Sequence, residues 1–189
     1  MDAFDAIARR TSTRTFTPEP VPRYVIERLI AAAVRAPNHK LTEPWRFAVL
    51  TGESKHRYAE IRREHRAKRW EDPDDPQAKK SIERTWREAL ETPAFVVVMC
   101  AVSDDPLRRE EDYGASMMAI ENLLVAAAAD NIGTFLRTGG IMQHPALAEL
   151  VHLPAGYRIV GIVSVGYLAA APEPTPRRHA PAELTQWLD

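Results

Sequence analysis

Arginine and hydroxyl side chains gather beside the predicted elements of this sequence, and their chemistry suits the binding of an anion. Three arginines and three hydroxyl residues fill positions 9–14 (RRTSTR), just after a predicted first helix. Further donors lie at positions 35–40 (RAPNHK), 137–140 (RTGG) and 177–178 (RR). Guanidinium forks and hydroxyls suit a phosphate and a polyol chain. Each group alone is also explained by solvation or by a helix dipole, whereas the four groups together suggest one anionic ligand.

The signatures of several other enzyme classes do not occur in this sequence. No glycine-rich phosphate loop follows a predicted strand, and there is no Gly-x-Ser-x-Gly elbow. The six histidines never stand three or four positions apart, and Cys100 is the single cysteine, so we expect no metal site. Four histidines are interpreted as surface or helix-end residues: His56, His65, His144 and His152. Acidic residues at 104–105 and 110–112 flank a predicted helix start, so we assign no catalytic acid or base.

Length and composition place the chain among soluble single-domain proteins. It has 189 residues, of which 45% are hydrophobic and 27% charged. Its 25 basic and 26 acidic residues leave a net charge of -1, which argues against binding to nucleic acid or to a membrane. One cysteine and an acidic first segment without an apolar run lead us to expect a cytoplasmic protein without a signal peptide.

Apolar spacing predicts an α+β fold, with helices flanking a mixed or antiparallel sheet. Helices are expected over residues 2–10, 54–70, 77–91, 113–130 and 145–151, and strands over 46–51, 94–102, 133–137 and 158–166. A second helix is expected to be lined by Val25, Leu29, Ala32 and Ala33 and to be ended by Pro37. In the first helix, Phe4, Ile7 and Ala8 are expected to face inward. The strand at 94–102 is apolar at every position, which is typical of a central strand covered on both faces.

Three further segments bear on assembly and binding. The helix at 113–130 is apolar on more than one face, so it is expected in the core or at a subunit interface. The proline-rich tail at 167–189 is expected to lie extended across the body or a partner chain. The basic helix at 54–70 could be a nucleic-acid patch, but the acidic run at 71–75 favours a solvated helix face.

The order of these pieces resembles the FMN-dependent nitroreductase family. That family opens with a helix ending in an Arg-Arg/His-Ser-x-Arg/Lys segment, to which positions 9–14 are similar. Its second helix leads into A-P-S-x-x-N-x-Q-P-W-R-F, and positions 36–47 here read APNHKLTEPWRF. The close of the chain is also similar, with GIVSVGY at 161–167 and RRHAP at 177–181. The resemblance covers essentially the whole chain and is strongest to small bacterial members.

The resemblance implies an intertwined homodimer with two FMN sites at the subunit interface. Arg9, Arg10 and Thr11 would hold the phosphate and ribityl chain or the pyrimidine edge of the flavin. Arg35 and His39 would reach the same flavin from the other subunit.

Two later segments complete the cofactor site that the resemblance implies. Leu136, Arg137 and Thr138 would lie along the isoalloxazine or ribityl side of FMN. Arg177 or Arg178, in the tail, would complete the phosphate site. No residue is assigned to acid–base catalysis or to a metal.

The activity implied is that of an NAD(P)H-dependent flavin oxidoreductase. NAD(P)H would deliver hydride to flavin N5, and a small electron-poor acceptor, such as a nitroaromatic or a quinone, would then use the same slot in ping-pong order. Leu41 and Glu43 replace the motif's Asn and Gln, and Leu168 replaces a closing proline. The alternatives are a non-catalytic flavin-fold binding or scaffold dimer, and a specialised flavoenzyme on the same fold, such as a dehalogenase or a flavin-destroying enzyme.

Overall fold

The computed structural model describes residues 1–171 and 178–188, which form helices packed on a four-stranded sheet. The α-helices are α1 (Ala3–Arg9), α2 (Arg23–Ala33), α3 (Gly52–Ala67), α4 (Pro76–Glu91), α5 (Pro106–Ala129), α6 (Pro145–Leu150) and α7 (Pro181–Leu184). Two 3-10 turns are η1 (His39–Leu41) and η2 (Gly140–Gln143). The strands are β1 (Trp45–Leu50), β2 (Ala94–Ala101), β3 (Ile132–Arg137) and β4 (Tyr157–Tyr167).

The sheet is antiparallel throughout, in the order β1-β2-β4-β3. The expected α+β class is therefore confirmed, and of the two sheet types expected the antiparallel one is found. The strand β2 has seven buried positions followed by one of intermediate exposure, which confirms its central place. A register shift between Val98 and Met99 interrupts its pairing with β4. Such a bulge increases the local twist of the sheet.

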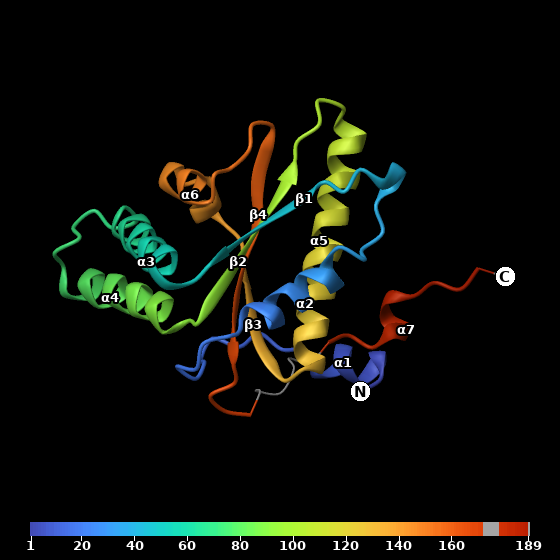
Figure 1. The fold of residues 1–189 in the computed structure, drawn as a ribbon, viewed down its shortest axis with the longest axis horizontal. Helices are drawn as coiled ribbons and strands as arrows, with labels where there is room; N and C mark the ends of the chain where they lie inside the picture. Colours follow the sequence, from blue (N-terminus) through green and yellow to red (C-terminus); the bar gives the residue numbers. More distant parts are fainter. Residues whose placement is uncertain (172–177, 189) are drawn as a thin grey trace.

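Helices cover both faces of the sheet, as Figure 1 shows, with α1, α2 and α5 on one side and α3, α4 and α6 on the other. The first side encloses a core built around Leu29, Ile120 and Leu123, and the second a core built around Tyr58, Phe95 and Ile162. The helix α5 begins before the expected start, because the side chain of Asp105 caps Leu107 N–H. Its inner residues are buried in the first core, as expected.

The first helix does not meet the expectation for its apolar residues. Phe4 is 86% exposed and Ile7 is also exposed, and Ala6 is the buried residue of α1. The reason is that this helix of seven residues packs mainly on α5, so most of its surface extends past the core. The described end of the chain also projects away from the body (Figure 1), and Trp187 there is 86% exposed.

An extended segment after α1 runs beside β3 and the end of β4. Thr13 N–H donates to the Thr134 carbonyl at 2.8 Å, and Thr17 N–H donates to the Tyr167 carbonyl at 2.9 Å. Arg14 lies between these two residues in sequence, so the two hydrogen bonds position it near the carboxyl end of β3. In residues 1–171 and 178–188, no helix is long and apolar enough to cross a membrane.

Candidate functional site

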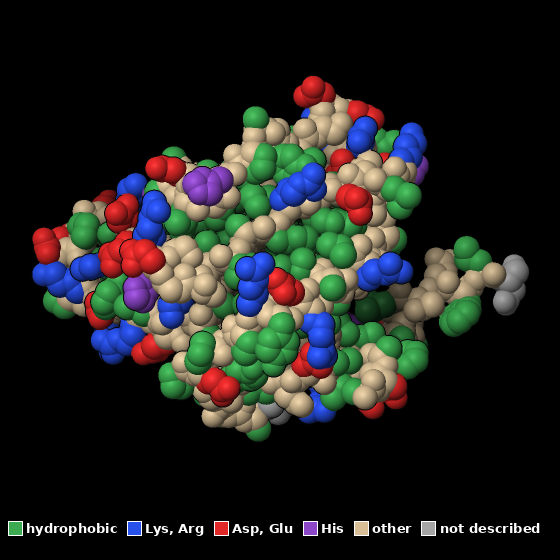
Figure 2. Space-filling model, in the orientation of Figure 1, with side chains coloured by type: hydrophobic (Ala, Val, Ile, Leu, Met, Phe, Trp, Pro, Cys, Tyr) green, Lys and Arg blue, Asp and Glu red, His purple; other side chains and the backbone are tan. Residues whose placement is uncertain are grey.

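A cavity of about 530 Å³ lies between α3, α4 and the end of β3. Basic side chains and the loop after β3 dominate its lining. The residues are Arg14, Arg62, His65, Arg66, Arg69, Arg84, Thr85, Glu88, Phe135, Leu136, Arg137, Thr138, Gly139, Gly140 and Ile141. Figure 2 shows charged side chains crowding the α3–α4 side of the molecule, whereas hydrophobic side chains spread over the middle of the same view.

Two arginines share one aromatic ring in this cavity. The Arg14 guanidinium carbon lies 4.5 Å from the centre of the Phe135 ring, and that of Arg137 lies 4.7 Å from it. Phe135 and Arg137 stand two positions apart on β3, so strand alternation directs both to the same face of the sheet. Such cation–π contacts hold guanidinium groups in place without neutralising them.

A single carboxylate faces the arginines of the cavity. Glu88 lies 3.7 Å from a nitrogen of Arg137, and 3.8 Å from nitrogens of both Arg62 and Arg84. All three distances exceed the range of a good hydrogen bond. One carboxylate thus lies near three guanidinium groups. In all, six arginines and this one acidic residue line the cavity.

Several buried donors at the cavity lack a partner. Arg62 is only 7% exposed, and its Nη1 has no hydrogen-bond partner among the described residues. The buried Nε of Arg137 also has none. Burial lowers the pKa of the Arg137 guanidinium, and the nearby positive charge of Arg62 lowers it further. Because an orphaned buried donor is costly, this arrangement indicates a site for a ligand with several acceptor atoms.

The loop after β3 brings backbone into the cavity wall. Gly139 has a φ of 117° and a ψ of -169°, a conformation that a side chain would strain. A β-carbon on Gly140 would lie 3.4 Å from Cε1 of His65, in ordinary contact with that ring. Beside Gly139, by contrast, no heavy atom lies within 4 Å of the place of a β-carbon, so a ligand can approach the backbone closely there.

A pair of histidines supports this wall. The rings of His65 on α3 and His144 before α6 meet edge to face with centres 6.0 Å apart. Both ring nitrogens of His144 are buried and have no partner among the described residues. Burial lowers the pKa of His65, and His144, Arg69 and Lys68 lower it further. Both residues lie at helix ends, His65 in the last turn of α3 and His144 at the N-cap of α6, which agrees with their interpretation as surface or helix-end histidines.

The predicted cofactor residues fall into separate places in one chain. Leu136, Arg137 and Thr138 line the cavity. Arg9 and Thr11 line a small hollow of about 30 Å³ at the other end of β3, where Arg9 donates to the Asn131 side chain at 2.9 Å.

Three more predicted cofactor residues lie apart from the cavity. Arg10 lies 3.6 Å from Glu121 of α5. Arg35 follows α2, and His39 contacts Glu111 of α5 at 2.8 Å. Both belong to the α2–α5 side of the sheet, opposite the cavity. Arg177 lies outside the described residues.

Sequence reasoning missed four arginines of the cavity that come from α3, α4 and the turn between them: Arg62, Arg66, Arg69 and Arg84. The interpretation of the basic helix as a solvated face is wrong for Arg62, which is buried. A signal was present, because Arg62 stands four positions after Tyr58 and one after Ile61, on the apolar side of the helix. Arg14 belonged to the recognised motif but was not assigned a role in binding. In the described parts of the chain, no group of three or more His, Cys, Asp or Glu residues could hold a metal ion.

Comparison with known proteins decides the family. The model of the Nitroreductase family matches residues 7–167. The chain belongs to the nitroreductase family. YfhC of Bacillus subtilis, which is named as an NAD(P)H nitroreductase, is 29% identical over 174 residues, covering 89% of this chain and 86% of YfhC.

Solved structures of nitroreductase-like proteins share the fold. A nitroreductase-like family protein from Bacillus cereus has a TM-score of 0.83 and 29% identity, with 100% of this chain and 97% of that chain covered. Iodotyrosine deiodinase bound to FMN and 3-iodo-L-tyrosine has a TM-score of 0.77 and 20% identity, with 98% of this chain and 100% of that chain covered.

Proposed function

We propose that this nitroreductase-family protein is an FMN-dependent NAD(P)H oxidoreductase that reduces small electron-poor acceptors such as nitroaromatics or quinones. The observation that carries the proposal is the arginine-lined cavity at the end of β3, with buried donors that have no partner among the described residues. The family membership and the name of YfhC support the choice of cofactor and electron donor.

The residues of the cavity fit the chemistry of FMN. Its isoalloxazine ring presents carbonyl and ring-nitrogen acceptors, and its phosphate is an anion. The orphaned donors of Arg62 and Arg137 would meet such acceptors. A volume of about 530 Å³ is also in the range of small-molecule sites.

The protein's own residues bind and orient the cofactor. Arg14 and Arg137, held against Phe135, would supply positive charge at a fixed place. Thr138 would add a hydroxyl, and Gly139 would leave the backbone N–H groups of its loop accessible. FMN, when bound, supplies the capacity to accept hydride from NAD(P)H and to pass electrons to the acceptor. Preorganised charge in a partly dry site is a strong way to stabilise developing negative charge.

The same proposal includes a homodimer in which each site uses both chains. Arg35 and His39 lie on the side of the sheet opposite the cavity of their own chain, so they would serve the partner's site. Large apolar side chains exposed on one chain would be covered in such a dimer: Phe4, Ile7, Leu41, Leu107, Met118, Leu184, Trp187 and Leu188. A partner subunit would remove this exposed apolar surface from water. The roles of Arg9, Arg10, Thr11 and Arg177 remain predictions from the family resemblance.

Reductive dehalogenation is a second candidate, favoured by the similarity to iodotyrosine deiodinase across nearly the whole chain. Assays of NAD(P)H oxidation with a nitroaromatic, a quinone and a halophenol separate the two reactions. Turnover with the first two supports the oxidoreductase proposal, and turnover with the halophenol alone supports dehalogenation. A protein that binds no FMN and turns over none of them would instead support the non-catalytic dimer.

A further inference from the structure

The cavity carries more positive charge than FMN alone would neutralise. Its lining has six arginines and one glutamate, a formal excess of five positive charges. A phosphate monoester contributes only about -1.5 to -2 at neutral pH. A surplus therefore remains even if the whole phosphate lies among these side chains.

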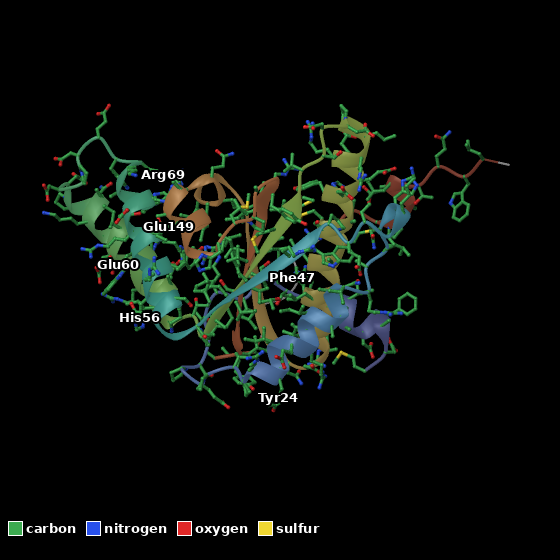
Figure 3. All side chains as sticks on the ribbon, turned by 45° about the horizontal axis from the view of Figure 1, so that its top comes forward. Tyr24, Phe47, His56, Glu60, Arg69 and Glu149 are labelled. Carbon is green, nitrogen blue, oxygen red and sulfur yellow. The ribbon has the colours of Figure 1, made fainter. Side chains whose placement is uncertain are left out.

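Two of the arginines are separate from the group around Phe135. Arg66 lies in the last turn of α3 and donates to the Ser81 hydroxyl at 2.6 and 2.9 Å, a neutral partner that leaves its charge uncompensated. Arg69 lies just beyond that helix, is exposed, and has no carboxylate within 4.0 Å in residues 1–171 and 178–188. Figure 3 labels Arg69 at this end of α3, beside α6.

Arg66 and Arg69 lie where they could contact an electron acceptor that binds in the same cavity as the cofactor. Arg66 and Arg69 line the same cavity as Thr138 and Gly139, so an acceptor at that loop would lie beside two positive charges. Guanidinium groups bind a carboxylate or a comparable anion through charge-assisted hydrogen bonds. A neutral aromatic molecule would make no such charge-assisted hydrogen bond with these two arginines.

We propose that the electron acceptor is an aromatic molecule with an anionic substituent, which Arg66 and Arg69 receive at the α3 side of the cavity. This inference rests on the proposed oxidoreductase function and specifies its substrate class. The anionic group fixes the orientation of the acceptor, and its aromatic ring remains in the cavity beside the loop after β3.

The test compares 4-nitrobenzoate with 4-nitrobenzamide, which have the same nitro group and nearly the same shape but differ in charge. Calorimetric titration of the purified protein measures binding of each, and NAD(P)H oxidation measures kcat/KM for each. We expect a preference for the benzoate of roughly tenfold in both measurements, the effect of about one charge-assisted hydrogen bond. Added salt is expected to reduce this preference, because the site is partly exposed.

Arg69→Gln is the decisive variant, since the Arg69 guanidinium makes no hydrogen bond or ion pair with the described residues. Arg57→Gln, at an exposed position of α3, is the matched control. Arg69→Gln is expected to remove most of the preference for the benzoate, and Arg57→Gln to preserve it. Equal binding of the two compounds to the wild type, or an unchanged preference in Arg69→Gln, would overturn the inference. If the charge preference in binding persists but FMN is not retained and no acceptor is reduced, the oxidoreductase proposal fails instead.

Discussion

Arg137 and Glu88 approach each other to 3.7 Å at the cavity wall without forming a good hydrogen bond. The same carboxylate also faces Arg62 and Arg84, so it neutralises no single arginine. The cavity thus carries a net positive charge before any ligand binds. An anionic ligand would neutralise the arginine charges that Glu88 leaves unpaired.

Glu88→Gln is expected to separate stability from ligand binding. Removing the carboxylate should lower the unfolding free energy of the ligand-free protein by about 1 kcal/mol, because three nearby guanidinium groups lose their shared partner and the site is partly exposed. FMN should then raise the melting temperature by more than it does in the wild type. Thermal unfolding with and without FMN measures both effects, and an equal or smaller shift in the variant would contradict this assignment of the cavity.

Arg137→Gln is expected to weaken FMN binding about tenfold or more, the loss of a charge-assisted hydrogen bond of about 1.5–3 kcal/mol. Fluorescence titration of the flavin-free protein measures the dissociation constant. Arg137→Lys, which keeps the charge without the planar fork, should lose less affinity. The control is Arg63→Gln, since Arg63 lies over Trp86 outside the cavity. Identical flavin affinity in Arg137→Gln and Arg63→Gln would show that the cofactor binds elsewhere.

Gly139→Ala is expected to distort the loop after β3, because its φ of 117° strains any side chain by roughly 1–3 kcal/mol. Flavin retention through gel filtration should fall in this variant. Gly140→Ala, where the added carbon meets only ordinary contact with His65, should retain more flavin. If Gly139→Ala retained more flavin than Gly140→Ala, the backbone of this loop would not approach the ligand as proposed.

Gly166→Ala tests the packing of the segment that carries Arg14. An added β-carbon would lie 2.7 Å from Cδ1 of Phe16 and 2.8 Å from Cδ of Pro93, both parts of rings. We expect a loss of about 1–3 kcal/mol in unfolding free energy from this overpacking. Gly114→Ala in α5, with nothing within 4 Å, should be neutral or stabilising. Urea unfolding of both variants checks the difference, and equal stabilities would refute the close packing of Phe16.

The histidine pair predicts a pH dependence of stability. Burial lowers the pKa of His65 in the folded protein, so the unfolded chain takes up the proton first as pH falls. The stabilising contribution of neutral His65 is fully present above a pH of about 6.5 and is lost as pH falls through that value toward the folded pKa. Replacement by Gln should therefore flatten the fall in melting temperature between pH of about 7 and about 5. A fall of unchanged slope would show that the pKa of His65 is the same in the folded and unfolded states.

Much of the fold was predictable because its signals are local. The uninterrupted apolar run of β2 and the apolar spacing of α5 identify a central strand and a buried helix. The position of Phe4 was not predictable in this way, because apolar spacing does not say whether the covering surface belongs to the same chain.

The candidate site was only partly predictable. Arg137 ends a recognisable strand and Thr138 follows it, so the sequence predicted both as binding residues. Arg62 was missed because a basic helix hides one buried arginine among several exposed ones, and its burial depends on how α3 packs against α4 and β3. Whether Arg35 and His39 complete a site depends on a second chain, which no pattern within one sequence can position.

The absorption spectrum of the purified protein tests the central claim most directly. We predict a yellow protein whose flavin bands bleach when NADH or NADPH is added without oxygen, and return when a nitroaromatic follows. A colourless protein that binds no added FMN, and whose spectrum does not change with reduced nicotinamide, would contradict the account.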